Sequence, residues 1–520
     1  MATAGTQKGI LGWIERTGNR LPDPAFIFLY LIVVLVIVSV VMALMGVSAE
    51  HPTQKLDDGS AKIISATSLL AADNIQKLWV DMPKTFTHFH PLGYVLVVML
   101  GAGVAERVGL FGTAMRAAVR NAPTFLLTPM VALVAMIGNL AADAAYVVLI
   151  PLAGVLYVAA GRHPIAGIGA AFAGVSGGFS ANLLPGQLDA LLFGITEAAA
   201  EALEPGWDAN IAGNWYFIAV MTFVFLPVIW FVTDVIIERR LGKFTPEPGS
   251  DFEGQNEDRP ITDAERKGLR NAGIAGLLVI AAWTVFTVGP GTPLIDETAE
   301  GPGRLSPFFR SLVAAFFVLF LAAGWAYGSA VGTVKDHRDV VRMMSEAMGD
   351  LAYYLVLAFF AAHFVAMFNW SNLGLIFAIK GAAAIQSAEL STPMLLATMV
   401  LLTGLVNLFV GSASAKWALL APVMVPMLML LNVSPEATTA AYRVGDSATN
   451  IITPLMVYFP LILTFCQRYN KEFGLGSLTA MMLPYSIWLM ISGLALTFLW
   501  IYMGWPLGPL ASVEYQLPSQ

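Results

Sequence analysis

Residues 442–454 read YRVGDSATNIITP, and this stretch decides the fold. Arg443 and Asp446 stand three residues apart and are followed by small polar residues and a proline. The chain around them is almost entirely apolar, with VMVPMLMLL before the stretch and LMVYFPLILTF after it. Charged side chains at membrane depth are costly and usually mark a substrate or ion pathway. The stretch therefore predicts a membrane helix that is broken at a functional site.

The overall composition is that of a membrane protein. Of the 520 residues, 57% are hydrophobic and 12% are charged, whereas about 25% of the residues in a soluble domain are charged. The apolar runs are continuous rather than alternating, which predicts membrane helices and excludes a barrel. Cys466 is the only cysteine, so no internal disulfide forms. The sequence has no Walker A or zinc motif, which leaves an ATP-driven pump without support.

Basic residues orient the chain in the membrane. Lys8, Arg16 and Arg20 precede the first apolar run, so the positive-inside rule places the N-terminus in the cytoplasm. We predict an all-α polytopic protein of the bacterial inner membrane, with nine transmembrane helices, two re-entrant hairpins, two broken helices and an inverted-topology repeat. In chain order the predicted units are a cytoplasmic N-terminus (1–23), a first scaffold span (24–46), a periplasmic loop (47–88), repeat 1 (89–234), a cytoplasmic loop (235–270), scaffold spans (271–329), repeat 2 (330–506) and a periplasmic tail (507–520).

The two predicted repeats contain a span, a hairpin, a broken helix and a span, in that order. Repeat 1 has its hairpin at 124–160 and its broken helix at 164–196, and repeat 2 has them at 393–432 and 437–465. The hairpin tips GNLAADAAYVVLIPL (138–152) and GSASAKWALLAPVMVP (411–426) align with an offset of 273. The breaks GGFSANLLPG (177–186) and GDSATNIITP (445–454) align with offsets of 267 to 269. Repeats of opposite orientation predict a secondary transporter with its site at the repeat interface.

The motifs at the tips and breaks resemble a known family. The stretches GSASAKWALLAPVMVPMLML and AAYRVGDSATNIITPLMVYF, together with AAFAGVSGGFSANL and the preceding GRHPIAGI, are similar to the aminobenzoyl-glutamate transporter (AbgT) family. The resemblance runs over nearly the whole chain. It implies a bowl-shaped homodimer with nine spans and two hairpins in each protomer. It also implies transport of p-aminobenzoyl-glutamate, or export of sulfonamide antimetabolites, driven by an ion gradient.

The resemblance also assigns roles to individual residues. Those implied to matter for transport are Ser414, Trp417, Arg443, Asp446, Pro454 and Asp189. A sodium site like that of some family members would be formed by Asn407, Gly411, Asp446 and Asn450. The first hairpin tip departs from the family by reading GNLAAD in place of a Ser-Asn-Thr run, which puts a second cation site in doubt.

The chemistry of Arg443 and Asp446 leaves two interpretations open for each residue. A guanidinium holds a carboxylate with two hydrogen bonds, so Arg443 is an anchor for an anionic substrate. The alternative is a structural pair with Asp446, which stands three residues on along the same helix. Asp446 would bind a cation or carry a proton. Asn407 and Asn450 would add neutral oxygens to a cation site or form hydrogen bonds between helices.

Further candidates surround this pair. Trp417 would stack on an aromatic substrate or lie at the membrane interface. Asp189 would take part in transport or would be a solvated helix end. Asp143 would lie in a hydrated hairpin tip. His363 is interpreted as a core histidine. The remaining predicted substrate contacts are small polar residues at the tips and breaks, with packing alone as the alternative: Ser412, Ser414, Ser180, Asn182 and Asn139.

The sequence thus predicts a secondary active transporter that works by alternating access. We expect a small-molecule substrate, a lipid bilayer around the protein, no nucleic-acid partner and no cofactor other than a coupling ion, Na⁺ or H⁺. One alternative is a sodium-coupled dicarboxylate importer, which would depend far less on Trp417 than a carrier of aromatic conjugates. Alternatives from other classes are an intramembrane hydrolase of the conjugate and a passive channel.

Overall fold

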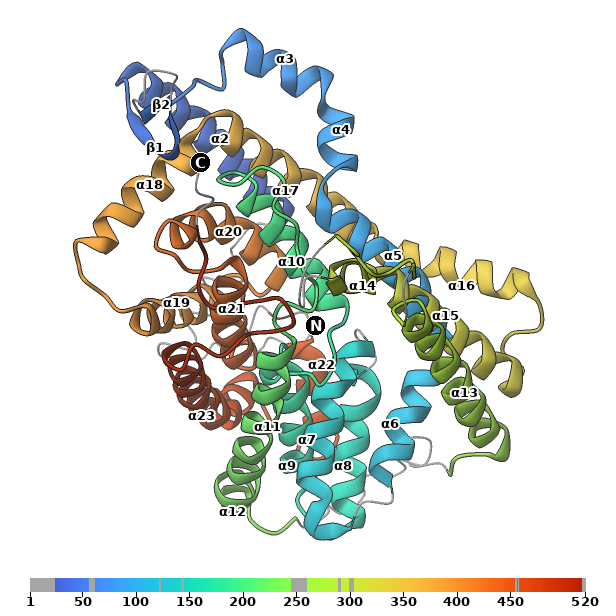
Figure 1. The fold of residues 1–520 in the computed structure, drawn as a ribbon. Coiled ribbons are helices and arrows are strands. Elements are labelled where there is room, and N and C mark those ends of the chain that lie inside the picture. The colour runs from blue at the N-terminus through green and yellow to red at the C-terminus, as the bar shows by residue number, and fades with distance from the viewer. Residues whose placement is uncertain are drawn as a thin grey trace.

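Helices account for most of the protein. The computed structural model describes residues 24–55, 61–120, 123–141, 145–244, 260–288, 291–298, 304–453, 456 and 458–516. Over these ranges, six helices are long and apolar enough to cross a membrane (Figure 1). They are α2 (Pro24–Leu44), α11 (Trp215–Phe231) with its continuation through η5 (Val232–Ile237) and α12 (Glu238–Leu241), α13 (Asp263–Val285), α15 (Leu312–Val331), α17 (Ala352–Trp370) and α23 (Leu475–Tyr502).

A bent helix pair adds a seventh candidate span. The helices α5 (His90–Arg107) and α6 (Leu110–Arg120) meet at an angle of 65°. The bend falls at Gly109, whose φ of +86° is a conformation that glycine adopts without steric cost. The other two of the nine predicted spans are the broken helices 164–196 and 437–465, which are pairs of short helices in the structure. The count of nine therefore stays a prediction.

Short apolar helices build the two predicted hairpins. The first contains η1 (Thr124–Leu126), α7 (Leu127–Ile137), η2 (Gly138–Ala141), η3 (Ala145–Leu149) and α8 (Ile150–Ala159). The second contains α19 (Thr392–Asn407) and α20 (Ala413–Met429). The residues that link these two helices are 408–412, so the link shares only Gly411 and Ser412 with the predicted tip 411–417, whose other residues begin α20.

The two predicted helix breaks are present, although the second lies later than expected. The first interruption separates α9 (Pro164–Phe172) and η4 (Ala173–Gly177) from α10 (Gln187–Ala200). The second separates α21 (Pro435–Asn450) from α22 (Phe459–Gln467). Arg443 and Asp446 therefore lie inside regular helix, and the chain leaves the helix only after Asn450.

The segment after the first span is more structured than a loop. It holds β1 (Ser48–Lys55) and β2 (Ala61–Ser65), which pair antiparallel, followed by α3 (Ala72–Val80) and α4 (Met82–Thr87). This hairpin is an exception to the all-α prediction. The side-chain amide of Asn372 donates to the carbonyl of Ser65 at 2.9 Å, which ties the segment to the chain reversal between α17 and α18 (Leu373–Gln386).

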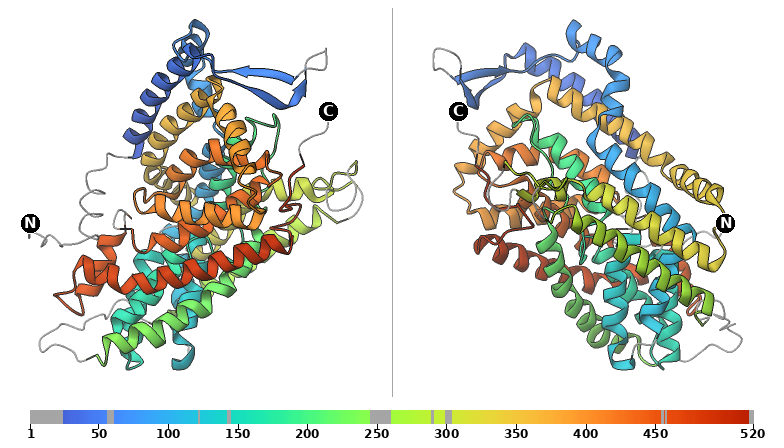
Figure 2. Two further views of the ribbon diagram at one scale, coloured as in Figure 1. Left: turned by 90° about the vertical axis from the view of Figure 1, so that its left-hand side faces the viewer. Right: turned by 45° about the vertical axis from the view of Figure 1, so that its right-hand side comes forward.

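The helices form two groups around α5 and α21. One group packs α5 against α15 and α16 (His337–Asp350), and α15 in turn against α13 and the short α14 (Ser306–Arg310). The larger group surrounds α21 and includes α10, α19, α20 and α23, with α23 lying beside α11 (Figure 2). Most of the buried apolar side chains belong to one cluster that contains this second group together with α2, α7, α8, α9 and α17.

A close helix crossing places α21 in this group. At Gly445 a side-chain carbon would lie only 2.2 Å from the backbone carbonyl oxygen of Val400 in α19. A hydrogen in place of a side chain thus lets the two backbones touch, as small residues do in membrane helix packing. The crossing brings the end of α19 against the polar half of α21.

Substitution of Gly445 is expected to destabilise the protein. Gly445→Ala forces α19 and α21 apart, and overpacking of this kind costs about 1–3 kcal/mol. The matched control is Gly273→Ala in α13, where an added carbon meets nothing within 4 Å; there the change to a better helix former gains up to about 1 kcal/mol. The two variants are unfolded thermally in the same detergent. Equal melting temperatures would contradict the close crossing of α19 and α21 at Gly445.

Candidate functional site

The candidate site is built around α21, a helix whose residues are all buried. Its start is fixed by Ser434, whose hydroxyl accepts a hydrogen bond from the Ala437 amide at 3.1 Å, and by Pro435 in the first turn. The helix contacts α10, α19, α20, α23 and η4. Charges on it are therefore removed from water and need partners from these neighbours.

Arg443 pairs with an acid from the other half of the chain. Its Nη1 donates to Oδ1 of Asp189 in α10 at 2.6 Å, and the two side chains are 1% and 4% exposed. The other oxygen of Asp189 accepts from the Gly186 amide at 2.7 Å, which caps the start of α10. The interpretation of Asp189 as a solvated helix end is therefore wrong. The expected structural pair of Arg443 with Asp446 is also wrong.

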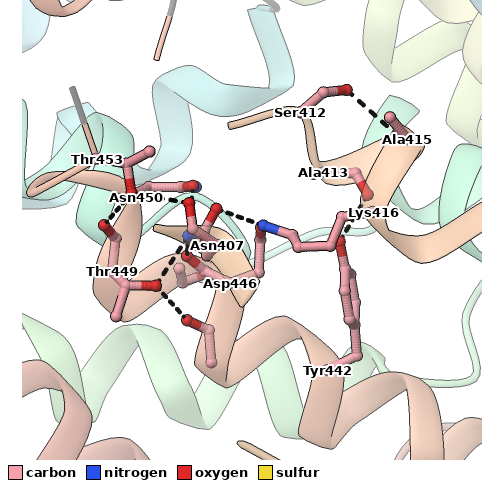
Figure 3. Close-up of polar contacts among 12 residues, drawn as sticks. Asn407, Ser412, Ala413, Ala415, Lys416, Tyr442, Asp446, Thr449, Asn450 and Thr453 are labelled. Atoms are coloured by element: carbon pink, nitrogen blue, oxygen red, sulfur yellow. Dashed lines mark hydrogen bonds and ion pairs between the residues drawn. The ribbon is translucent and has the colours of Figure 1, made fainter. Parts of the chain in front are cut away.

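Asp446 instead pairs with Lys416, which the sequence analysis missed. Lys416 lies in the first turn of α20, its side chain is fully buried, and its Nζ lies 2.5 Å from Oδ1 of Asp446 (Figure 3). The same Nζ donates to Oδ1 of Asn407. The sequence did contain a signal for Lys416. A basic residue inside the apolar hairpin 393–432 is as unusual as Arg443 in its apolar surroundings, so the same argument would have singled it out.

Three of the four predicted ion-coupling residues come together at this lysine. Asn407, the last residue of α19, donates through Nδ2 to the Asp446 carbonyl at 2.7 Å and to Oδ1 of Asn450 at 2.9 Å (Figure 3). It also donates to the hydroxyl of Thr449 at 2.8 Å. Gly411 lies in the link between α19 and α20 and has no side chain to contribute. The network joins the second hairpin to the end of α21.

Trp417 is part of the protein interior. It is fully buried, its Nε1 donates to the hydroxyl of Thr196 in α10 at 3.0 Å, and its ring lies 4.3 Å from that of Tyr442 at an interplanar angle of 31°. The Tyr442 hydroxyl donates to the carbonyl of Ala413 at 2.6 Å. The interpretation of Trp417 as a residue of the membrane interface is therefore wrong, and its neighbouring aromatic ring is that of Tyr442.

The serines of the second hairpin tip have different surroundings. The Ser412 hydroxyl caps α20 by accepting from the Ala415 amide at 3.3 Å, and it lies 3.3 Å from the Ser414 hydroxyl. Ser414 borders a small, mainly apolar cavity between α10, α17 and α20. Other residues lining this cavity are Phe89, Ile195, Leu357 and Ala361.

The first helix break touches α21, close to the second break. The Ser180 amide donates to the Ser447 hydroxyl at 3.0 Å, and these are positions that the repeat alignment matches with an offset of 267. Asn182 donates to the carbonyl of Met136 at 3.1 Å, and Asn139 donates to that of Gly178 at 3.4 Å. A contact between matched positions is what a two-fold relation between repeats produces.

Several buried polar atoms at this junction are without partners. Among the described residues, Arg443 Nε, Ser180 Oγ and Asn139 Oδ1 have no hydrogen-bond partner. Buried polar atoms are normally satisfied, because leaving one unpaired costs about 1–3 kcal/mol. These atoms are therefore candidates for contact with a solute.

The other candidate residues add less to the site. Pro454 and Asp143 lie outside the described residues. His363 is buried within α17, where its Nδ1 is 2.7 Å from the Phe359 carbonyl, while its Nε2 has no hydrogen-bond partner among the described residues. Within the described ranges, no group of three or more histidine, cysteine or acidic side chains is arranged to hold a metal ion.

Removal of Arg443 is expected to be strongly destabilising. Arg443→Met leaves the Asp189 carboxylate buried without its cation, which costs about 3–5 kcal/mol, and adding Asp189→Asn in the same chain should recover much of this loss. Arg310→Met, which breaks an exposed pair with Asp208, is the control and should cost at most about 1 kcal/mol. The loss of stability is measured as the fall in melting temperature of each purified variant. Equal falls for Arg443→Met and Arg310→Met would argue against a buried Arg443–Asp189 pair.

Comparison with known proteins identifies the family. Residues 9–515 match the model described as "AbgT putative transporter family". The chain is 36% identical, over 97% of each sequence, to the p-aminobenzoyl-glutamate transport protein of Escherichia coli strain K12.

Two solved structures have the same fold. The YdaH transporter of Alcanivorax borkumensis is 42% identical, with a TM-score of 0.86 over 94% of this chain and 100% of that one. Neisseria gonorrhoeae MtrF, described as illuminating a class of antimetabolite efflux pumps, is also 42% identical, with a TM-score of 0.89 over 97% of this chain and 100% of MtrF.

These relatives decide the class of protein. All of them are transporters, so the intramembrane hydrolase is not supported. Residues 174–178, GVSGG, do match the GxSxG pattern of some hydrolases. Ser176, however, is buried within the helical turn η4 and its hydroxyl contacts the sulfur of Met456, whereas the nucleophile of that pattern stands exposed on a strand-to-helix turn. The sequence match over nearly the whole chain and the shared fold show that this protein belongs to the AbgT transporter family.

Proposed function

We propose that the protein is a secondary active transporter of p-aminobenzoyl-glutamate and of sulfonamide-type aromatic antimetabolites in the bacterial inner membrane. The name of the E. coli relative supports the first substrate, and the description of MtrF supports the second. The structural observation that carries the proposal is the Arg443–Asp189 ion pair, which lies fully buried between the two halves of the chain.

Arg443 suits the anionic part of this substrate. p-Aminobenzoyl-glutamate carries two carboxylates, and a guanidinium holds one carboxylate with two parallel hydrogen bonds. Arg443 uses Nη1 for Asp189, while its Nε has no partner among the described residues. A substrate carboxylate would take over Arg443 from Asp189, so that the buried guanidinium keeps an anionic partner throughout the cycle.

Aromatic side chains next to Arg443 suit the benzoyl ring. Tyr442 precedes Arg443 in α21 and stacks on Trp417 of the second hairpin. An entering aromatic ring would replace one ring of this pair. The arrangement favours a conjugate over a plain dicarboxylate, the alternative substrate class, because a dicarboxylate makes no use of the stacked rings.

Alternating access would use contacts that cross between elements. Arg443–Asp189 joins α21 to α10, Lys416–Asp446 joins α20 to α21, and Ser180–Ser447 joins the first break to α21. Interfaces of this kind have discrete alternative pairings. We propose that the hairpins and broken helices move against the group of α5, α13 and α15, in a homodimer with nine spans and two re-entrant hairpins per protomer and a cytoplasmic N-terminus.

Ion coupling is tested by imposing gradients one at a time. Labelled p-aminobenzoyl-glutamate is offered to proteoliposomes under a proton or a sodium gradient. We expect the flux to follow one of them and to be lost in Asp446→Asn, because the coupling carboxylate is removed. Asp208→Asn, which changes an exposed acid, should transport normally. A wild-type flux that ignores both gradients would point to a passive channel.

The substrate class is tested at Trp417. Trp417→Ala removes a ring whose stacking is worth about 1 kcal/mol, so it should weaken p-aminobenzoyl-glutamate transport about five- to tenfold, while Trp417→Phe keeps the stack and most of the activity. Competition by a plain dicarboxylate such as succinate, measured in the same vesicles, is the comparison. If Trp417→Ala weakens both solutes equally, the aromatic selectivity is wrong.

A further inference from the structure

A lysine side chain lies where the family resemblance places a sodium ion. The implied ligands of that ion are Asn407, Gly411, Asp446 and Asn450. The ammonium of Lys416 contacts Oδ1 of Asp446 at 2.5 Å and Oδ1 of Asn407 as well. We infer that Lys416 is the resident cation of this site, and that the protein therefore binds no Na⁺ there. The inference rests on the proposed function in one respect, which is that it takes this site to be the one that couples transport to ions.

The orientation of Asn407 follows from the lysine. An ammonium group donates hydrogen bonds and accepts none, so the atom of Asn407 that faces it is the amide oxygen. The amide nitrogen then points the other way, toward the carbonyl of Asp446, the hydroxyl of Thr449 and Oδ1 of Asn450. All three are acceptors that share the two amide hydrogens of Asn407, so one orientation of the amide agrees with every contact (Figure 3).

The remaining oxygens of the implied site are also in use. Oδ1 of Asn450 accepts from Asn407. The Thr449 hydroxyl accepts from Asn407 and donates to the Gly445 carbonyl at 2.9 Å. Gly411 has no side-chain oxygen. A hard cation such as Na⁺ needs several oxygen ligands. Here Oδ1 of Asp446 and the side-chain oxygens of Asn407, Asn450 and Thr449 already serve the lysine or one another.

The balance of charge at the site also argues against a sodium ion beside Asp446. Lys416 and Asp446 are fully buried and neutralise each other, and Arg443 and Asp189 do the same. The formal charges of these four side chains sum to zero. A sodium ion beside Asp446 would place a second cation against a carboxylate that already has one, at a depth where unpaired charge is costly. The ring of Tyr442, with its centroid 6.0 Å from Nζ, adds a further weak attraction for the ammonium.

The lysine also has a steric role. It extends from the first turn of α20, close to the hairpin tip, to the middle of α21 and the end of α19. Sodium could take this position only after Nζ has left it. The amine and the metal ion are thus mutually exclusive occupants of one position.

Thermal unfolding of the purified protein without substrate tests the inference. Each variant is melted in NaCl and in choline chloride at constant ionic strength. For the wild type we expect equal melting temperatures in the two salts. Lys416→Met removes the ammonium but keeps the length of the side chain, so Asp446 loses its cation. This variant should melt lower in choline and should be stabilised by Na⁺ in a saturable manner, because a ligand that binds only the folded state raises its stability.

Two further variants serve as controls. Lys416→Arg retains a cation and should show no sodium effect. The double variant Lys416→Met with Asp446→Asn is neutral at both positions, and it should lose the sodium response of the single variant. If Lys416→Met does not fold, Lys416→Gln replaces it in the same comparison.

Either of two results would overturn the inference. One is saturable stabilisation of the wild type by Na⁺ that disappears in Asp446→Asn. The other is a sodium response of Lys416→Met no larger than that of the wild type. Because the measurement needs no substrate, it is independent of whether p-aminobenzoyl-glutamate is carried. Conversely, a failure to transport p-aminobenzoyl-glutamate would count against the proposed function and leave the lysine inference standing.

Discussion

The central constraint on this protein is that charged side chains within its interior need partners. Four of the charged residues on α10, α20 and α21 form two buried ion pairs, in which each residue has an opposite charge within hydrogen-bond distance. Removing one member would leave the other unpaired in a medium that solvates it poorly. The positions of α10, α20 and α21 are thus fixed relative to one another by electrostatics as well as by packing.

The local sequence makes these pairings possible. Gly445 lets α21 approach α19 so closely that Asn407 reaches across to the backbone of Asp446. Asp189 serves twice, since one oxygen caps the start of α10 and the other accepts from Arg443. The interruption after Gly177 frees the Ser180 amide, which in regular helix would bond to a carbonyl four residues back, to contact Ser447. At this junction, small residues and helix ends therefore hold the elements together, whereas large apolar side chains do so elsewhere in the core.

The same features give a transporter what it requires. Each ion pair joins two different helices, so a change in their relative position would separate the pair unless each member found another partner. Arg443 has an anion to hold in the absence of substrate, and Lys416 gives Asp446 a cation in the absence of a bound metal ion. A site that is neutral when empty can rearrange within the membrane without moving unpaired charge.

The sequence by itself determined the features that depend on local pattern. The apolar runs indicated membrane helices, the polar and glycine-rich interruptions marked both helix breaks, and the motifs at 411–430 and 440–459 identified the family. The positions of Asn407, Asp446 and Asn450 at one site were also expected, and the structure brings their side chains together.

Only the tertiary structure decided which charges are partners. Spacing along α21 suggested that Arg443 pairs with Asp446, but each finds a partner on another helix, Asp189 and Lys416 respectively. Asp189 is 254 residues away from Arg443 in sequence, and no local pattern connects the two. Residues three apart on a helix interact weakly, whereas a buried charge takes the partner that the packing of whole helices brings within reach.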